Sequence, residues 1–397
     1  MSRSDAHFLR GILRRFVGHC VFTCSALILT NTYSQSQGTP RGLDVETLSP
    51  EAASVYRVWQ RYLASKNGEW SVNAGAPSID WLQSEQKRWP MYDLASFYIP
   101  HGAIPEIVSV ERTEACGRSE YRILTRFRSG NRGPGVSSLA AVNVTVYAVR
   151  DADRWVLANA LPFRTCAWRR AAVGQITYIF APGYPYDAAR ARRAVAFSDS
   201  VASAFSLPRL DSLTYYLTTS IDEMYEIIGL ESDIKYGSGP VGGLAQPVNH
   251  QLFSGNPRIG EEYRHELAHL ILAPICCGGT SYLVSEGVPT WLGGTAGMDF
   301  ATAARGLGAF LADHPAVSLD SILSGSYDNA IVYPAGAVLA DLVFERGGVT
   351  AVKGLFNAGG TPTDLRSSLE RQLGRPWRAI LLDWRQRAMA LATRYVR

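Results

Sequence analysis

The stretch His265-Glu-Leu-Ala-His269 narrows the possible structures of this 397-residue chain more than any other part of the sequence. It fits the pattern H-E-x-x-H. On an α-helix, residues four apart lie on one face, so both imidazoles can aim a nitrogen at one point. A zinc ion takes its first two protein ligands in this way. Glu266 is rotated by about 100° from His265, which leaves it free to reach a water beside the metal.

The neighbouring residues favour a helix for this motif. The acidic residues of 260–262 are expected in its first turn, where they would stabilise the positive end of the helix dipole. Leu267, Leu270 and Ile271 supply an apolar face. Pro274 is expected to end the helix, because residues before a proline avoid helical dihedral angles.

A catalytic zinc ion with two histidine ligands needs a third protein ligand, and Glu286 is the candidate. We expect Ser285 to cap a helix that begins at Glu286, with Pro289 in its first turn and Gly293-Gly294 at its end. A glutamate at the start of a helix packed on the histidine helix can point at the same ion. The alternative is an ordinary N-terminal glutamate stabilised by the helix dipole.

These two helices together resemble the gluzincins, the zinc peptidases with two histidine ligands and one glutamate ligand. The branch that they resemble is the aminopeptidase-N-like, or peptidase MA-like, one. A third landmark of that branch is a tyrosine in a Tyr-x-x-Gly helix, which is matched by Tyr333-Pro-Ala-Gly336. The resemblance implies that Tyr333 donates a hydrogen bond to the tetrahedral oxyanion. The predicted metal ligands are His265, His269 and Glu286, with Glu266 as the general base.

The resemblance covers residues 173–397 and includes two departures. The chain has no Gly-x-Met-Glu-Asn segment, with which true aminopeptidases hold the free amine of a substrate. The run 242–245 takes about that place without an acidic residue, so we do not expect a true aminopeptidase. Thr290 stands four residues after Glu286, where some relatives carry an acidic residue that orients a ligand histidine. Which group orients a ligand histidine here is left open.

The N-terminus resembles a secretory signal peptide. Arg10, Arg14 and Arg15 precede an apolar stretch over 16–30, which is short and interrupted for a membrane span. Small residues follow at 32–34. We therefore predict a signal peptide over 1–34, a secreted or periplasmic protein, and no stable membrane span after cleavage. An uncleaved signal anchor is the alternative.

The cysteines and the charge bear on the compartment and the partners. Cys116 and Cys166 flank one β-rich segment and could form a disulfide in an oxidising compartment. Cys276 and Cys277 are adjacent and lack the spacing of a zinc site. The net charge of +4 is too small and too dispersed to indicate a nucleic-acid partner. We expect a peptide or protein substrate, and the oligomeric state is left open.

The chain is long enough for two domains. We expect a linker over 35–47, a smaller α+β accessory domain over 48–172 and a peptidase domain over 173–397. In the accessory domain, helices over 50–65 and within 78–89 precede strands over 106–111, 121–128, 140–149 and 155–161. This order resembles the nuclear-transport-factor-2-like cone.

The second part alternates strands and helices before the motif and is mostly helical after it. Before the motif we expect strands over 175–181, 213–218 and 244–253, and helices over 187–206 and 221–229. After it we expect helices over 300–313, 328–346, 349–357, 363–373 and 376–395. The predicted fold class is α+β, a zincin-like peptidase domain with a mostly helical C-terminal part. In zincins, an edge strand such as 244–253 pairs with an extended substrate.

These features predict a secreted zinc-dependent peptidase, a hydrolase in which Glu266 takes the proton of a metal-activated water. One alternative is a metal-stabilised protein with little or no activity that binds a ligand through its N-terminal domain. The presence of Glu266 favours the peptidase, since a purely structural metal site needs no base. Hydrolysis of a non-peptide bond is a further alternative. The substrate sequence and the choice between endo- and exopeptidase are left open.

Overall fold

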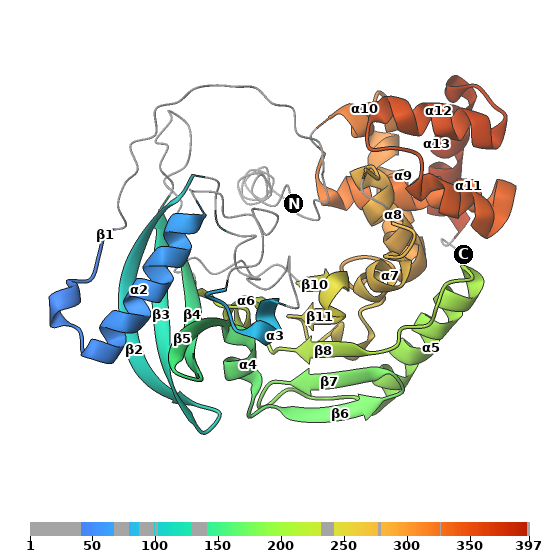
Figure 1. The fold of residues 1–397 in the computed structure, drawn as a ribbon. Helices are drawn as coiled ribbons and strands as arrows, with labels where there is room; N and C mark the ends of the chain where they lie inside the picture. Colours follow the sequence, from blue (N-terminus) through green and yellow to red (C-terminus); the bar gives the residue numbers. More distant parts are fainter. Residues whose placement is uncertain are drawn as a thin grey trace, which may run out of the picture.

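The computed structural model combines helices and strands, in agreement with the predicted α+β class (Figure 1). The predicted signal peptide lies outside the described residues. Within the described ranges, no helix is long and apolar enough to cross a bilayer. The structure describes residues 41–66, 79–86, 99, 102–128, 141–231, 242–276, 279–325 and 327–394.

The first sheet has the strand order β1-β2-β3-β4-β5. Its strands are antiparallel except β1, which runs parallel to β2. The predicted strands of the accessory domain are all present in it. They are β2 (Ile104–Ala115), β3 (Arg118–Arg128), β4 (Ala141–Asp151) and β5 (Arg154–Asn159). The short strand β1 (Arg41–Gly42) was not predicted.

Helix α2 (Pro50–Ser65) packs on the first sheet, as its apolar spacing predicts. Ser49 caps it, and Pro50 occupies the first turn, where the missing N–H is least harmful. The indole N–H of Trp59 donates to the buried Thr125 hydroxyl at 2.7 Å. The second predicted helix is the short α3 (Gln83–Gln86) in the described residues.

A disulfide joins Cys116 in the β2–β3 turn to Cys166 at the end of α4 (Ala160–Thr165). The pairing suggested by the sequence is therefore present. Cys276 is exposed, and Cys277 lies outside the described residues.

The second sheet has the order β10-β11-β8-β7-β6. Its three central strands are parallel, and the two outer strands are antiparallel to their neighbours. Helix α5 (Ala188–Ala204) connects β7 to β8. The strands are β6 (Arg169–Val173), β7 (Ile176–Phe180), β8 (Leu213–Leu217), β10 (Gly243–Gln246) and β11 (Gln251–Ser254).

The single strand predicted over 244–253 is wrong. The segment is a hairpin, in which β10 and β11 are joined by the 3-10 turn Pro247–Asn249. Pro247 has no N–H with which to continue a ladder, and His250 adopts a left-handed conformation with φ 49°. As a result β10 is the edge strand, and β11 lies inside the sheet.

The second sheet packs on both of its faces. Tyr178, Tyr215 and Leu252 belong to the core formed with the C-terminal helices. Ile179 and Tyr216, on the opposite face, belong to the core of the first sheet. The segment that follows β8 joins the same core through α6 (Ile221–Ile227) and β9 (Leu230–Glu231), and β9 pairs with β4.

The chain after the motif helix is mostly helical, as predicted. Gly348 interrupts α11 with a φ of 60°, at the point where the glycine pair predicts a boundary between two helices. Helix α10 was not predicted. The helices are α7 (Arg264–Leu272), α8 (Tyr282–Gly293), α9 (Phe300–Asp313), α10 (Leu319–Ser324), α11 (Asn329–Phe356), α12 (Pro362–Leu373) and α13 (Trp377–Arg394). In Figure 1, α9–α13 lie at the end of the molecule away from the first sheet.

Candidate metal centre

Helix α7 carries the H-E-x-x-H motif and ends at Leu272, before Pro274, as predicted. It begins later than expected, because Gly260–Glu262 forms a separate 3-10 turn. The two acidic residues of that turn do not lie in the first turn of α7. Glu261 is buried and accepts a hydrogen bond from the Asp187 backbone N–H at 2.7 Å. Glu262 pairs with Arg193 at 2.6 Å.

Helix α8 carries Glu286, but not at its start. It begins at Tyr282 with Ser281 at the N-cap position, so Glu286 lies in its second turn. The predicted cap at Ser285 is wrong, since the Ser285 hydroxyl donates to the Tyr282 carbonyl at 3.1 Å. Leu283 and Val284 are buried, which favours helix over the first turn. Pro289 therefore lies inside the helix rather than in its first turn.

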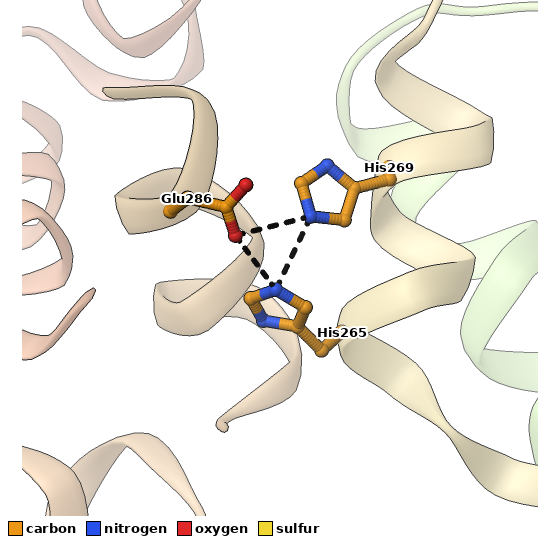
Figure 2. A group of neighbouring side chains, drawn as sticks. All are labelled: His265, His269 and Glu286. Atoms are coloured by element: carbon orange, nitrogen blue, oxygen red, sulfur yellow. Dashed lines mark hydrogen bonds and ion pairs between the residues drawn. The ribbon is translucent and has the colours of Figure 1, made fainter. Parts of the chain in front are cut away.

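The three predicted ligands converge (Figure 2). The Nε2 atoms of His265 and His269 are 3.2 Å apart. Oε2 of Glu286 lies 3.2 Å from the first and 3.5 Å from the second. Two atoms that each lie about 2.0–2.1 Å from a tetrahedral zinc ion are about 3.3 Å apart. The observed spacings therefore fit one small cation between the three side chains.

The proton of His265 is held on the far side of its ring. Nδ1 of His265 lies 3.0 Å from the carbonyl oxygen of Gly294. A carbonyl only accepts, so Nδ1 carries the proton and Nε2 turns its lone pair toward Glu286 and His269. The sequence left open which group orients a ligand histidine, and for His265 it is this carbonyl. Oγ1 of Thr290 lies further from Nδ1, at 3.5 Å. Sequence reasoning missed it because a backbone carbonyl has no residue signature.

Charge is concentrated in this centre. Burial alone would lower the pKa of His269, but the charge of Glu286 and its hydrogen bond raise that pKa to about 8. Burial would raise the pKa of Glu286, but the charge of His269 and its hydrogen bond hold that pKa well below its usual range. The protein without metal therefore keeps a carboxylate and a protonated imidazole in contact. A divalent cation can replace that proton.

Glu266 lies beside the edge strand of the second sheet. Its side chain is half-buried, and its negative charge contributes to the raised pKa of His269. A Cβ atom at Gly243 in β10 would lie 2.9 Å from Cγ of Glu266 and 2.3 Å from the Tyr263 ring. Only glycine fits there, so the backbone of β10 lies directly against the expected base.

Tyr333 lies on α11, over the ring of His265. The two rings are parallel within 6°, with centroids 5.5 Å apart. Burial raises the pKa of the Tyr333 hydroxyl, and the charge of Glu286 raises it further, so the group keeps its proton. The structure thus places the fifth predicted site residue next to the three converging ligands.

Two glycines allow α8 and α11 to touch. A Cβ at Gly336 would lie 2.1 Å from the Leu283 carbonyl oxygen, and a Cβ at Gly287 would lie 2.4 Å from the Gly336 carbonyl carbon. Each glycine lies close in sequence to a predicted site residue on the same helix. Gly287 follows Glu286, and Gly336 stands one helical turn after Tyr333.

The arrangement offers three candidate metal ligands, a neighbouring carboxylate and a hydroxyl donor on one side of a sheet edge. Sequence reasoning did not identify Tyr282, whose hydroxyl lies 3.2 Å from that of Tyr333. No model of a known protein family matches the sequence, and no curated protein matches it either.

Proposed function

We propose that this chain is a zinc-dependent peptidase of the gluzincin type, with a zincin-like fold in its second part. The observation that supports it most is the spacing of 3.2–3.5 Å between the ligand atoms of His265, His269 and Glu286. A structural zinc site with four protein ligands needs no such neighbours as Glu266 and Tyr333.

In the proposed mechanism, His265, His269 and Glu286 would hold the zinc ion. Bound zinc would act as a Lewis acid and would lower the pKa of water to about 7. Glu266 accepts a proton from the attacking water and passes it to the nitrogen of the leaving amine. Tyr333 donates its hydroxyl hydrogen bond to the oxyanion that develops on the scissile carbonyl.

The edge strand β10 supports a peptide as the substrate. Its outer side has no partner strand in the described sheet. An extended peptide can pair with such an edge through its backbone. Because Gly243 brings this edge against Glu266, a paired peptide would pass close to the base. We further propose secretion, which the Cys116–Cys166 disulfide supports because disulfides persist in oxidising compartments.

A second candidate is a metal-stabilised ligand-binding protein, and one observation favours it. A surface pocket of about 380 Å³ lies between α2 and the β4–β5 hairpin. Its lining includes Arg150, which lies 4.4 Å from the Trp155 ring centroid and pairs with Glu51 at 3.4 Å. Arg61 in the same lining pairs with Asp80. A charged ligand there would have to displace these pairs.

The substitution Glu266→Gln tests the peptidase. Removal of the base should lower turnover by about 100-fold or more, while the three metal ligands remain intact. Hydrolysis of a peptide library by the zinc-loaded protein, followed by mass spectrometry, measures turnover, and elemental analysis measures zinc content. Glu345→Gln is the matched control, since Glu345 is an exposed glutamate on α11.

Two results would contradict the proposal. Glu266→Gln could hydrolyse peptides as fast as the unchanged protein, which would remove the role of Glu266. The unchanged protein could bind one zinc ion and cleave no peptide, which would favour the ligand-binding alternative.

A further inference from the structure

The hydroxyl of Tyr282 stands between two polar groups beside the candidate metal centre. It lies 3.2 Å from the Tyr333 hydroxyl and 3.2 Å from Oδ1 of Asn329. Tyr282 is the first residue of α8, and Asn329 is the first residue of α11. The ring of Tyr282 packs edge-on against that of Tyr333, with centroids 6.1 Å apart.

A proton count shows what these contacts allow. A phenol has one proton to donate, and an amide oxygen only accepts. With its proton on Asn329, Tyr282 can only accept from Tyr333. The proton of Tyr333 then goes either to Tyr282 or to the neighbouring Glu286 carboxylate. Tyr282 can instead turn its proton to the oxygen of Tyr333, which frees the proton of Tyr333 for another acceptor.

We propose that Tyr282 is a positioning residue that switches Tyr333 between these two hydrogen-bond states. The inference depends on the proposed peptidase function. In the resting state of the zinc-loaded protein, in which Glu286 would be engaged as a metal ligand, Tyr333 donates to Tyr282 and Tyr282 donates to Asn329. When an oxyanion develops beside Tyr333, Tyr333 turns its proton to it, and Tyr282 turns its own proton to Tyr333. Each proton stays on its own oxygen, and no covalent bond forms or breaks.

The second state strengthens Tyr333 as a donor. A hydrogen bond donated to the phenol oxygen stabilises the partial negative charge that this oxygen gains as its own proton moves toward the oxyanion. The close contact of α8 and α11 at Gly287 and Gly336 keeps the two hydroxyls within reach of each other. Tyr282 is 40% exposed, so the loss of its hydroxyl leaves no buried polar group unpaired in the core.

The test is a mutant cycle in the zinc-loaded protein. Tyr282→Phe should lower kcat by about 3- to 10-fold, the value of one hydrogen bond, with KM nearly unchanged. In a Tyr333→Phe background, the same substitution should have no further effect, because its target hydroxyl is gone. Asn329→Leu removes only the resting-state acceptor, so kcat should stay at or above that of the unchanged protein. Tyr225→Phe, on α6, is the control tyrosine.

A second measurement does not depend on turnover. A phosphinic pseudopeptide carries a tetrahedral, negatively charged phosphinyl group in place of the oxyanion. Calorimetry should show that Tyr282→Phe weakens its binding by about 3- to 10-fold, but not in the Tyr333→Phe background. The zinc content should be the same in all variants.

The possible failures are distinguishable. If the unchanged protein cleaves peptides and Glu266→Gln does not, but Tyr282→Phe behaves like the unchanged protein, only the switch is refuted. Equal losses from Tyr282→Phe in both backgrounds would show a merely structural role, and a loss of kcat in Asn329→Leu would also overturn the switch. If the unchanged protein neither cleaves peptides nor binds the phosphinic compound, the proposed function fails, and the switch fails with it.

Discussion

At the scale of single residues, the proposed metal centre depends on the positions of two protons. The Gly294 carbonyl holds one of them on Nδ1 of His265, so Nε2 of that ring is a ready ligand. The other proton is on His269, whose pKa is raised to about 8. A zinc ion must displace this second proton before His269 can become a ligand.

Zinc affinity should therefore depend on pH. Below about pH 8, each unit of acidification should weaken zinc binding by about tenfold, because one proton competes with the metal. Above pH 8 the dependence on this group should disappear. Competition with a chelating dye between pH 6 and pH 9 measures the affinity. A flat profile between pH 6 and pH 8 would contradict a raised pKa of His269.

The metal-free protein should show the opposite trend in stability. The folded pKa of His269 is raised above its ordinary value of 6.5. Its contribution to stability is complete below pH 6.5 and is lost as the pH rises through about 8. Thermal unfolding of the metal-free protein should thus move to lower temperature between pH 6.5 and pH 8. A His269→Gln variant should lack this change.

Several of these residue-scale features could be predicted, and others could not. The spacing of His265 and His269 predicts their convergence on a helix, and the Glu-Gly and Tyr-x-x-Gly patterns predict the other partners. The carbonyl of Gly294 and the hydroxyl of Tyr282 have no such pattern. Their roles depend on how α8 lies against its neighbours, which only the folded chain fixes.

At the scale of elements, the crossing of α8 and α11 brings Glu286 and Tyr333 to one place. The backbones touch where Gly287 faces Gly336, and neither position has room for a methyl group. Packed helix interiors resist such added volume, and the usual response is a shift of one element. A shift of about 1 Å at the proposed metal site would lower the proposed peptidase activity by about 100-fold.

Gly336→Ala should therefore impair both stability and the site. We expect a loss of about 1–3 kcal/mol in the free energy of unfolding. We also expect a loss of activity of about 100-fold, because Tyr333 moves relative to His265. Gly306→Ala, on α9, is the matched control, since a Cβ there meets nothing within 4 Å. Similar behaviour of the two variants in chemical denaturation would contradict the role of the crossing.

The helices were easier to predict than their ends. The apolar spacing and the Ser49 cap define α2 from local residues alone. In α8, Ser281 and Ser285 are both possible caps, and the burial of Leu283 decides between them. The β10–β11 hairpin was missed because the run over 244–253 resembles one continuous strand. The break that Pro247 makes in this run was not recognised.

At the scale of the whole molecule, the second sheet is shared by two hydrophobic cores, one on each of its faces. Its residues alternate between the core of the C-terminal helices and the core of the first sheet. Tyr216 and Phe253 stack on the side of the first sheet, with ring centroids 4.9 Å apart. Sequence periodicity alone did not reveal this sharing, because the contact of β9 with β4 joins residues far apart in the chain.

Removal of the first part should therefore damage the metal centre. A chain beginning at residue 167 would expose Ile179, Tyr216 and Phe253, each of which stabilises the fold by about 1.5–3 kcal/mol when buried. We expect such a chain to aggregate and to bind no zinc. Recovery of a soluble chain that binds one zinc ion, measured by light scattering and elemental analysis, would refute this prediction.

The sheet shared by the two cores also limits how such a chain can change in evolution. Recombination at the junction would pack one apolar face of the sheet against side chains from an unrelated sequence. The resulting mismatch would also destabilise the half that was not exchanged. A substitution at Tyr216 or Phe253 likewise requires compensating changes in the core of the first sheet, against which these two side chains pack. We expect the two halves to be inherited together.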